Sequence, residues 1–165
     1  MSLSTLTPAL SEAEKAAITQ DVLQAVKPMF AAAERMDPAW VLTFCQDTPE
    51  FQISWASGQT TDFAAADRTW RDLAARFTAQ SCQVFSQKIQ VLAADAVLHT
   101  WQGRTELTRQ DGGRVCFDPF SETALLRKVG STWKLASRFD SGTPTPMASP
   151  PVPGHGQVQL WGGVV

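Results

Sequence analysis

Few side chains in this chain of 165 residues can move a proton near neutral pH. The chain contains two histidines, three cysteines and no tyrosine. A mechanism that uses a tyrosine hydroxyl is therefore excluded, and so is a three-histidine metal site within one chain. Acid–base chemistry would fall to His99, to His155, or to a carboxylate or thiol with a shifted pKa. The residue types imply no metal and no cofactor.

His99 is the first candidate for a catalytic residue. It lies within a predicted strand, where Val97 and Trp101 fall on the same side because side chains alternate with a period of two. His99 is either a base or ligand donor inside a cavity, with Trp101 stacking on the ligand, or a half-exposed strand histidine. We predict that His99 is partly buried and that it faces the cavity together with Trp101.

Two carboxylates are further candidates. Asp140 ends the last predicted strand and is the second catalytic candidate, although Arg138 or Ser141 beside it could simply pair with it or cap it. Glu122 alternates with Phe120 on an earlier strand. Facing an apolar cavity, Glu122 would have a raised pKa and could act as an acid or base. The strand pattern alone favours surface exposure for Glu122.

Aromatic residues are plentiful, with six tryptophans and nine phenylalanines. Phe44, Trp55 and Trp70 come from three different predicted elements that should converge. Aromatic side chains bury large areas, so these residues form either plain core or the wall of a cavity. The cysteines at positions 45, 82 and 116 are odd in number and far apart in the sequence. We therefore expect free, buried or half-buried thiols.

Three helices must come first in the fold. Ser11 and Glu14 have the spacing of a capping box before an apolar pattern of helical period, in which Pro28 should kink or divide the helix. Asp37 followed by Pro38 has the pattern of a second helix start, and Asp62 that of a third.

Strands are predicted as well. A short strand is expected over 51–55, before the third helix, and longer ones follow that helix over 82–92, 95–109, 114–128 and 132–140. The pair Asp111–Gly112 between two of them is a strong hairpin signal. Asp118–Pro119 should produce a bulge or bend, because proline cannot donate to a strand ladder. The order predicts an α+β fold with a cone-shaped, curved antiparallel sheet of four to six strands wrapped around the N-terminal helices.

The domain is expected over 11–141. Residues 1–10 are predicted to be an N-terminal extension, and residues 142–165, rich in proline and glycine, to be a tail rather than an element of the fold.

The last strands carry a resemblance to a known family. Leu126-Arg127-Lys128, a short turn, Trp133-Lys134-Leu135 and Ser141 resemble the closing strands of the nuclear transport factor 2-like superfamily, in its SnoaL-like and ketosteroid-isomerase-like branch. Asp95-Ala96-Val97-Leu98 resembles a strand opening of the same superfamily. These motifs are structural and are shared by proteins of many functions.

The resemblance implies a ligand cavity inside the cone and a homodimer formed through the outer sheet face, with Phe85, Phe117 and Trp133 as contributors. Many relatives carry histidines where this chain has Ser137 and Phe139, and the isomerase uses a tyrosine that is missing here. The residues expected to line the cavity are Phe44, Trp55, Trp70, Trp101, Phe120, Glu122, Ser137 and Phe139.

Two functions stay open. One is a protein that binds a small apolar or carbonyl-containing molecule without catalysis. The other is a cofactor-independent isomerase, cyclase or dehydratase that transfers a proton through a cavity histidine or carboxylate. Arg104 and Arg109, near a strand end, could bind a carboxylate or could serve to blunt a sheet edge.

Other partners are not expected. The basic residues are scattered, which does not favour nucleic acid, and the apolar runs are far shorter than the ~18 residues of a membrane span. Residues 1–20 lack a secretory signal pattern, so we predict a cytoplasmic location.

Overall fold

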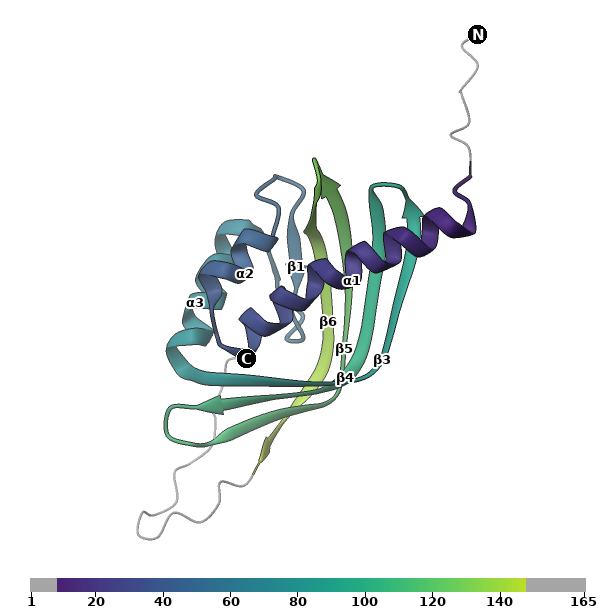
Figure 1. Cartoon of the computed structure of the whole chain (residues 1–165). Helices are drawn as coiled ribbons and strands as arrows, with labels where there is room; N and C mark the ends of the chain where they lie inside the picture. Colours follow the sequence, from purple (N-terminus) through teal and green to yellow (C-terminus); the bar gives the residue numbers. More distant parts are fainter. Residues whose placement is uncertain (1–8, 148–165) are drawn as a thin grey trace.

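Helices occupy the first half of the fold and long strands the second half in the computed structural model, which describes residues 9–147 (Figure 1). The elements in chain order are α1 (Glu12–Glu34), α2 (Pro38–Phe44), β1 (Gln52–Ser54), β2 (Thr60–Thr61), α3 (Phe63–Arg76), β3 (Phe77–Ala93), β4 (Ala96–Arg109), β5 (Arg114–Val129) and β6 (Thr132–Met147).

The helix starts follow the capping signals of the sequence. Ser11 and Glu14 form the predicted capping box, in which the Ser11 backbone N–H donates to the Glu14 carboxylate at 2.8 Å. Asp37 and Asp62 accept backbone N–H groups at the starts of α2 and α3. Pro28 does not divide the first helix, because α1 runs continuously through it. No helix among residues 9–147 is long and apolar enough to cross a membrane.

The strands form one curved, unclosed sheet in the order β2-β1-β6-β5-β4-β3. All neighbours are antiparallel except β1 and β6, which run parallel. The three helices lie on one face of this sheet, with α1 crossing over its strands (Figure 1). We call this the inner face, and the opposite one the outer face. The predicted α+β architecture is confirmed.

One irregularity decides which residues of β6 face inward. Leu126 pairs with Leu135 and Leu125 pairs with Ser137, so Ala136 is an extra residue in β6. Such a bulge shifts the alternation of side chains by one position. Leu135 before the bulge is buried, and the next inward residue is Arg138 rather than Ser137.

The end of β6 differs from the prediction. Residues 142–147, expected to begin the tail, belong to the strand and pair with β5. On its other side β6 pairs through residues 137–139 with β1 and through Leu135 with Cys45, so residues 142–147 form a sheet edge within the described residues. Proline is tolerated at an edge because its missing N–H need not serve a neighbouring strand, which explains how Pro144 fits. The rest of the predicted tail, and residues 1–8, lie outside the described residues.

Between helices and sheet lies the apolar core. Its most deeply buried side chains are Val22, Phe51, Ile53, Val97 and Leu126. Trp133 also belongs to this core, so its predicted role in an outer dimer patch is wrong. It precedes the bulge and therefore shares the inner face with Leu135. The three cysteines are free, as predicted.

Candidate functional site

A row of paired residues crosses the inner face from the free edge of the sheet towards its middle. Gln87 on β3 pairs with Trp101 on β4, Trp101 with Glu122 on β5, and Glu122 with Asp140 on β6. Directly opposite residues in antiparallel strands have Cβ atoms about 5 Å apart. The pairing therefore brings an indole and two carboxyl groups into one line across three strands.

Arg138 lies in the adjacent row and joins the two carboxyl groups. Its Nη2 donates to Asp140 Oδ2 at 2.8 Å, and its Nη1 lies 3.7 Å from Glu122 Oε2. All three side chains are buried, with exposed fractions of 7% for Arg138, 6% for Asp140 and 5% for Glu122. Asp140 thus forms an ion pair with Arg138, which the sequence analysis gave as the alternative to a catalytic role. The sequence preference for an exposed Glu122 is wrong.

Two tryptophans close around this ion cluster. The Arg138 guanidinium carbon lies 5.1 Å from the ring centre of Trp55 and 5.3 Å from that of Trp70. The two rings meet edge to face, with centres 5.7 Å apart. Cation–π attraction strengthens when water is excluded, so the rings stabilise the buried guanidinium. The cluster is therefore charged at its centre and aromatic on its helix side.

Several polar atoms in and beside the cluster have no hydrogen-bond partner. They are Asp140 Oδ1, Arg138 Nε, Trp70 Nε1 and Trp101 Nε1. Leaving a buried donor or acceptor unpaired costs about 1–3 kcal/mol, so such groups are rare and call for an explanation. Three of these atoms are donors and one is an acceptor; Trp70 lies against Arg138, and Trp101 is the strand partner of Glu122.

Burial also changes the proton affinity of Asp140. Loss of contact with water raises its pKa to about 7, and the nearby Glu122 carboxylate acts in the same direction. The Arg138 guanidinium opposes both effects. A carboxyl group with a pKa near neutrality can both accept and donate a proton at that pH.

His99 occupies a separate place on the same face. It is 1% exposed, and the side-chain amide nitrogen of Gln87 lies 2.8 Å from its Nε2. An amide N–H donates, so Nε2 of the neutral ring accepts. Burial lowers the pKa of His99 to about 4. Its pairing partner Ala124 separates it from Arg138 by two strand spacings, about 10 Å.

Aromatic rings pack around His99 and Trp101. Trp101 is buried on the same face as His99, and Phe30 of α1 packs edge-on against both, with centres 5.5 Å and 6.3 Å away respectively. Phe120 lies 5.1 Å from Trp101, and Phe117 lies 6.0 Å from Phe120. Phe117, predicted for an outer dimer patch, therefore belongs to this ring cluster.

Other predicted cavity residues lie elsewhere. Phe44 is part of the core and stacks on Trp40. Ser137 and Phe139 face outward, and Phe139 is 59% exposed. Their placement in the cavity, which rests on the resemblance to relatives with histidines at these positions, is wrong because Arg138 is the inward residue after the bulge at Ala136.

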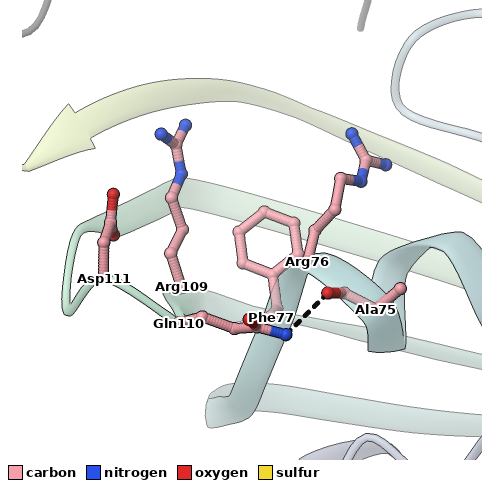
Figure 2. A pocket seen from close by; sticks show the side chains of 6 residues that line it. All are labelled: Ala75, Arg76, Phe77, Arg109, Gln110 and Asp111. Carbon is pink, nitrogen blue, oxygen red and sulfur yellow. Dashed lines mark hydrogen bonds between the residues drawn. The ribbon is translucent and has the colours of Figure 1, made fainter.

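Two hollows open on the surface, away from the ion cluster. One, of about 360 Å³, lies on the outer side and is lined in part by Leu125, Val129 and Ser137. The other, of about 290 Å³, contains Arg109 (Figure 2). Neither is lined by a tryptophan. Arg104, the other predicted carboxylate ligand, pairs with Glu106 at 3.0 Å.

Sequence reasoning did not select Arg138, Gln87 or Phe30 as site residues. For Arg138 a signal existed, since an arginine two positions before an aspartate on a strand shares its face. Gln87 lies on a polar, exposed strand edge, and nothing in that pattern distinguishes it. Among residues 9–147, no group of three or more His, Cys, Asp or Glu side chains could hold a metal ion.

Comparison with known proteins gives a clear result for structure alone. No protein-family model matches the sequence, and no curated protein is similar to it. A protein assigned as a scytalone dehydratase from Novosphingobium aromaticivorans is similar in structure, with a TM-score of 0.73 and 11% identity over 90% of this chain and 100% of that one.

Two further solved structures are similar to this chain. The hexachlorocyclohexane dehydrochlorinase LinA-type3 from Novosphingobium barchaimii has a TM-score of 0.68 and 11% identity, over 87% of this chain and 100% of that one. A nuclear transport factor 2-like superfamily protein from Salmonella enterica has a TM-score of 0.68 and 14% identity, over 86% and 99%. The chain described here therefore has the nuclear transport factor 2-like fold, as its closing strands predict.

Proposed function

We propose that the inner face of the sheet binds a small molecule that combines an apolar or aromatic body with a carbonyl or hydroxyl group. The observation that carries this proposal is the set of unpaired polar atoms at the ion cluster. A ligand oxygen placed among them would accept from an indole N–H or donate to Asp140, and would remove the cost of leaving them unpaired. Trp55, Trp70 and Phe120 would contact the apolar body.

The test uses a matched pair of probes, 1-tetralone and its hydrocarbon analogue tetralin. The ketone should shift the indole N–H resonances of Trp70 and Trp101 in a saturable way, whereas tetralin should not. Trp133 provides an internal control, because its Nε1 is also buried and unpaired but lies near Lys128, away from the cluster. Equal shifts at all three indoles, or equal binding of both probes, would contradict the proposal.

A second candidate function is proton transfer at the same place. Asp140, with its pKa raised to about 7 by burial, would take a proton from a carbon of the bound molecule and return it to a leaving group. The names of two similar structures, a dehydratase and a dehydrochlorinase, both denote eliminations. In such a reaction a C–H and a C–X bond break, a C=C bond forms, and HX leaves without any redox partner.

Asp140→Asn separates the two functions. The variant keeps the shape of the side chain but cannot transfer a proton, so elimination should stop while binding of 1-tetralone persists. Asp118→Asn is the matched control, because Asp118 lies on the adjacent strand but is exposed. Binding without any turnover of β-hydroxy ketones by the wild-type protein would favour the first function alone.

We also infer that the outer face binds a second copy of the chain. Phe139 projects there from the middle of the sheet, beside Thr123, its pairing partner, and Thr100. An exposed aromatic ring among small, uncharged side chains is typical of a contact surface. Light scattering should give a dimer mass that Phe139→Lys reduces to that of a monomer. The predicted cytoplasmic location stays a prediction.

A further inference from the structure

The second hollow lies at the junction of α3, the start of β3 and the β4–β5 hairpin, apart from the inner face. Its volume is about 290 Å³. The lining residues are Ala75, Arg76, Phe77, Arg109, Gln110 and Asp111. In Figure 2 the side chains of Arg76 and Arg109 extend to the same side, with the Phe77 ring between them.

Several contacts fix the shape of this hollow. Phe77 and Arg109 are pairing partners across β3 and β4. The Gln110 side-chain amide donates to the Ala75 carbonyl oxygen at 2.7 Å, which ties the hairpin to the end of α3 (Figure 2). The Arg109 backbone N–H donates to Gly113 O at 2.8 Å and closes the hairpin. These contacts fix the backbone that carries the two arginines.

The charges of the hollow favour an anion. Arg76 and Arg109 contribute two positive charges, and Asp111 one negative charge. One oxygen of Asp111 already accepts from the Gly113 N–H at 2.8 Å within the turn. Arg76 uses its Nε to donate to Asp72 O at 3.2 Å, and its two terminal amino groups lie further out. Guanidinium groups present N–H donors in a planar fork that matches a carboxylate.

The floor of the hollow is apolar. Phe77 is buried except for a small part of its surface, and the Arg76 guanidinium carbon lies 5.9 Å from its ring centre. A fully hydrated inorganic anion would gain nothing from this ring, whereas the apolar body of an organic acid would pack on it.

We propose that this hollow binds a small organic carboxylate, whose oxygens accept from Arg76 and Arg109 and whose apolar body contacts Phe77. The site shares no residue with the inner-face cluster, so this proposal does not depend on the function proposed above.

The test is a titration of the full-length protein followed by backbone amide resonances. The probe is benzoate, compared with benzamide, which has the same shape without the charge, and with inorganic phosphate, which has the charge without the ring. Benzoate should shift the amides of Phe77, Gln110 and Asp111 in a saturable way. Benzamide should cause no such shift, and phosphate should bind more weakly than benzoate.

Three variants sharpen the test. Arg76→Gln should weaken benzoate binding about twofold to fivefold, the range expected for one exposed charge pair. Asp111→Asn should strengthen it by a similar factor, because it removes a like charge. Arg71→Gln is the matched control and should change nothing, since Arg71 lies on the same helix but pairs with Asp67 at 2.6 Å.

Each alternative outcome overturns a stated part of the proposal. Equal binding of benzamide, or unchanged binding in Arg76→Gln, would exclude recognition by the arginines. Phosphate binding as tight as benzoate binding would exclude the role of Phe77 and the choice of an organic acid. Absence of any saturable shift would exclude the site altogether.

Discussion

His99 and Asp140 are both buried on the inner face, yet burial moves their pKa values in opposite directions. The pKa of His99 falls to about 4 and that of Asp140 rises to about 7. The common cause is loss of water, which disfavours the charged form of either group. The Gln87 amide and the Phe30 ring contact His99. Asp140 instead lies beside the Arg138 guanidinium, which it shares with the Glu122 carboxyl group.

The comparison separates a buried polar residue whose side chain is hydrogen-bonded from one whose hydrogen bonding is incomplete. His99 accepts a hydrogen bond from Gln87, and its other neighbours, the Phe30 ring and the strand partners Ile89 and Ala124, are apolar, so the neutral form of the imidazole is favoured. Asp140 keeps an unpaired oxygen and lies in a network whose total charge depends on its own proton. The position with the incomplete hydrogen bonding is the one that a ligand would complete.

The largest effect is expected from removing the central cation. Arg138→Met leaves the buried carboxyl groups of Asp140 and Glu122 without their shared partner. At pH 8 this should lower the free energy of unfolding by about 3–5 kcal/mol, measured by urea denaturation. The matched control is Arg127→Met, which breaks an exposed pair with Asp95 and should cost less than ~1 kcal/mol. Similar losses in both variants would show that the cluster is not an ion network.

The next effect is the pH dependence that Asp140 contributes. Its folded pKa lies above its unfolded value of 3.8, so the folded state binds the proton more tightly. This contribution to stability is complete below pH 3.8 and is lost as the pH rises through about 7. Each pKa unit corresponds to about 1.4 kcal/mol.

Asp140→Asn should remove the pH dependence that Asp140 contributes. The stability of the variant relative to the wild type should therefore increase between pH 5 and pH 8. Urea denaturation at several pH values measures the difference, with Asp118→Asn as the unchanged reference. A constant difference across this range would mean that Asp140 is already ionised throughout.

His99 should make the free energy of unfolding depend on pH in the opposite direction. Its folded pKa lies below its unfolded value of 6.5, so the unfolded state binds the proton more tightly. The contribution to stability is complete above pH 6.5 and is lost as the pH falls towards about 4. His99→Gln should be less sensitive to acid than the wild type over this interval. In the double variant with Asp140→Asn both pH-dependent contributions to stability should disappear. A pH dependence that persists would mean that other groups titrate in this range.

The smallest effect is expected at the hydrogen bond that holds His99. Gln87→Ala leaves Nε2 of the buried ring without its donor and should lower the free energy of unfolding by about 1–3 kcal/mol. The matched control is Gln90→Ala on the same strand, which points to the outer face and should have little effect. Equal effects of both substitutions would mean that the bond to His99 contributes nothing specific.

The sequence is informative wherever a pattern is local. The capping residues Ser11, Asp37 and Asp62 predict the helix starts, and Asp111–Gly112 predicts the hairpin, where Gly112 adopts a φ of 82°. The same holds for the shared face of His99 and Trp101, because the alternation between them is uninterrupted.

The candidate site is less predictable because it depends on long-range pairing. Nothing in Leu135-Ala136-Ser137 signals a bulge, since the segment has no glycine or proline. The extra residue follows from how β5 and β6 match over their whole length. Without it, the alternation leads from Trp133 to Phe139, and Arg138 is placed on the wrong face.

The bulge also makes the chemistry of the inner face a matter of strand register. Pairing Ala136 opposite Leu125 in a regular ladder would turn Arg138 and Asp140 towards solvent and bring Ser137 and Phe139 under the helices, whereas deleting Ala136 would remove the bulge and leave both faces as they are. An ion network would thus be exchanged for an aromatic lining by a one-residue shift in the register of β6. In a fold of this type, one extra residue accommodated as a bulge therefore keeps the charged side chains inside, and a change that would otherwise need several coordinated substitutions follows from its pairing alone.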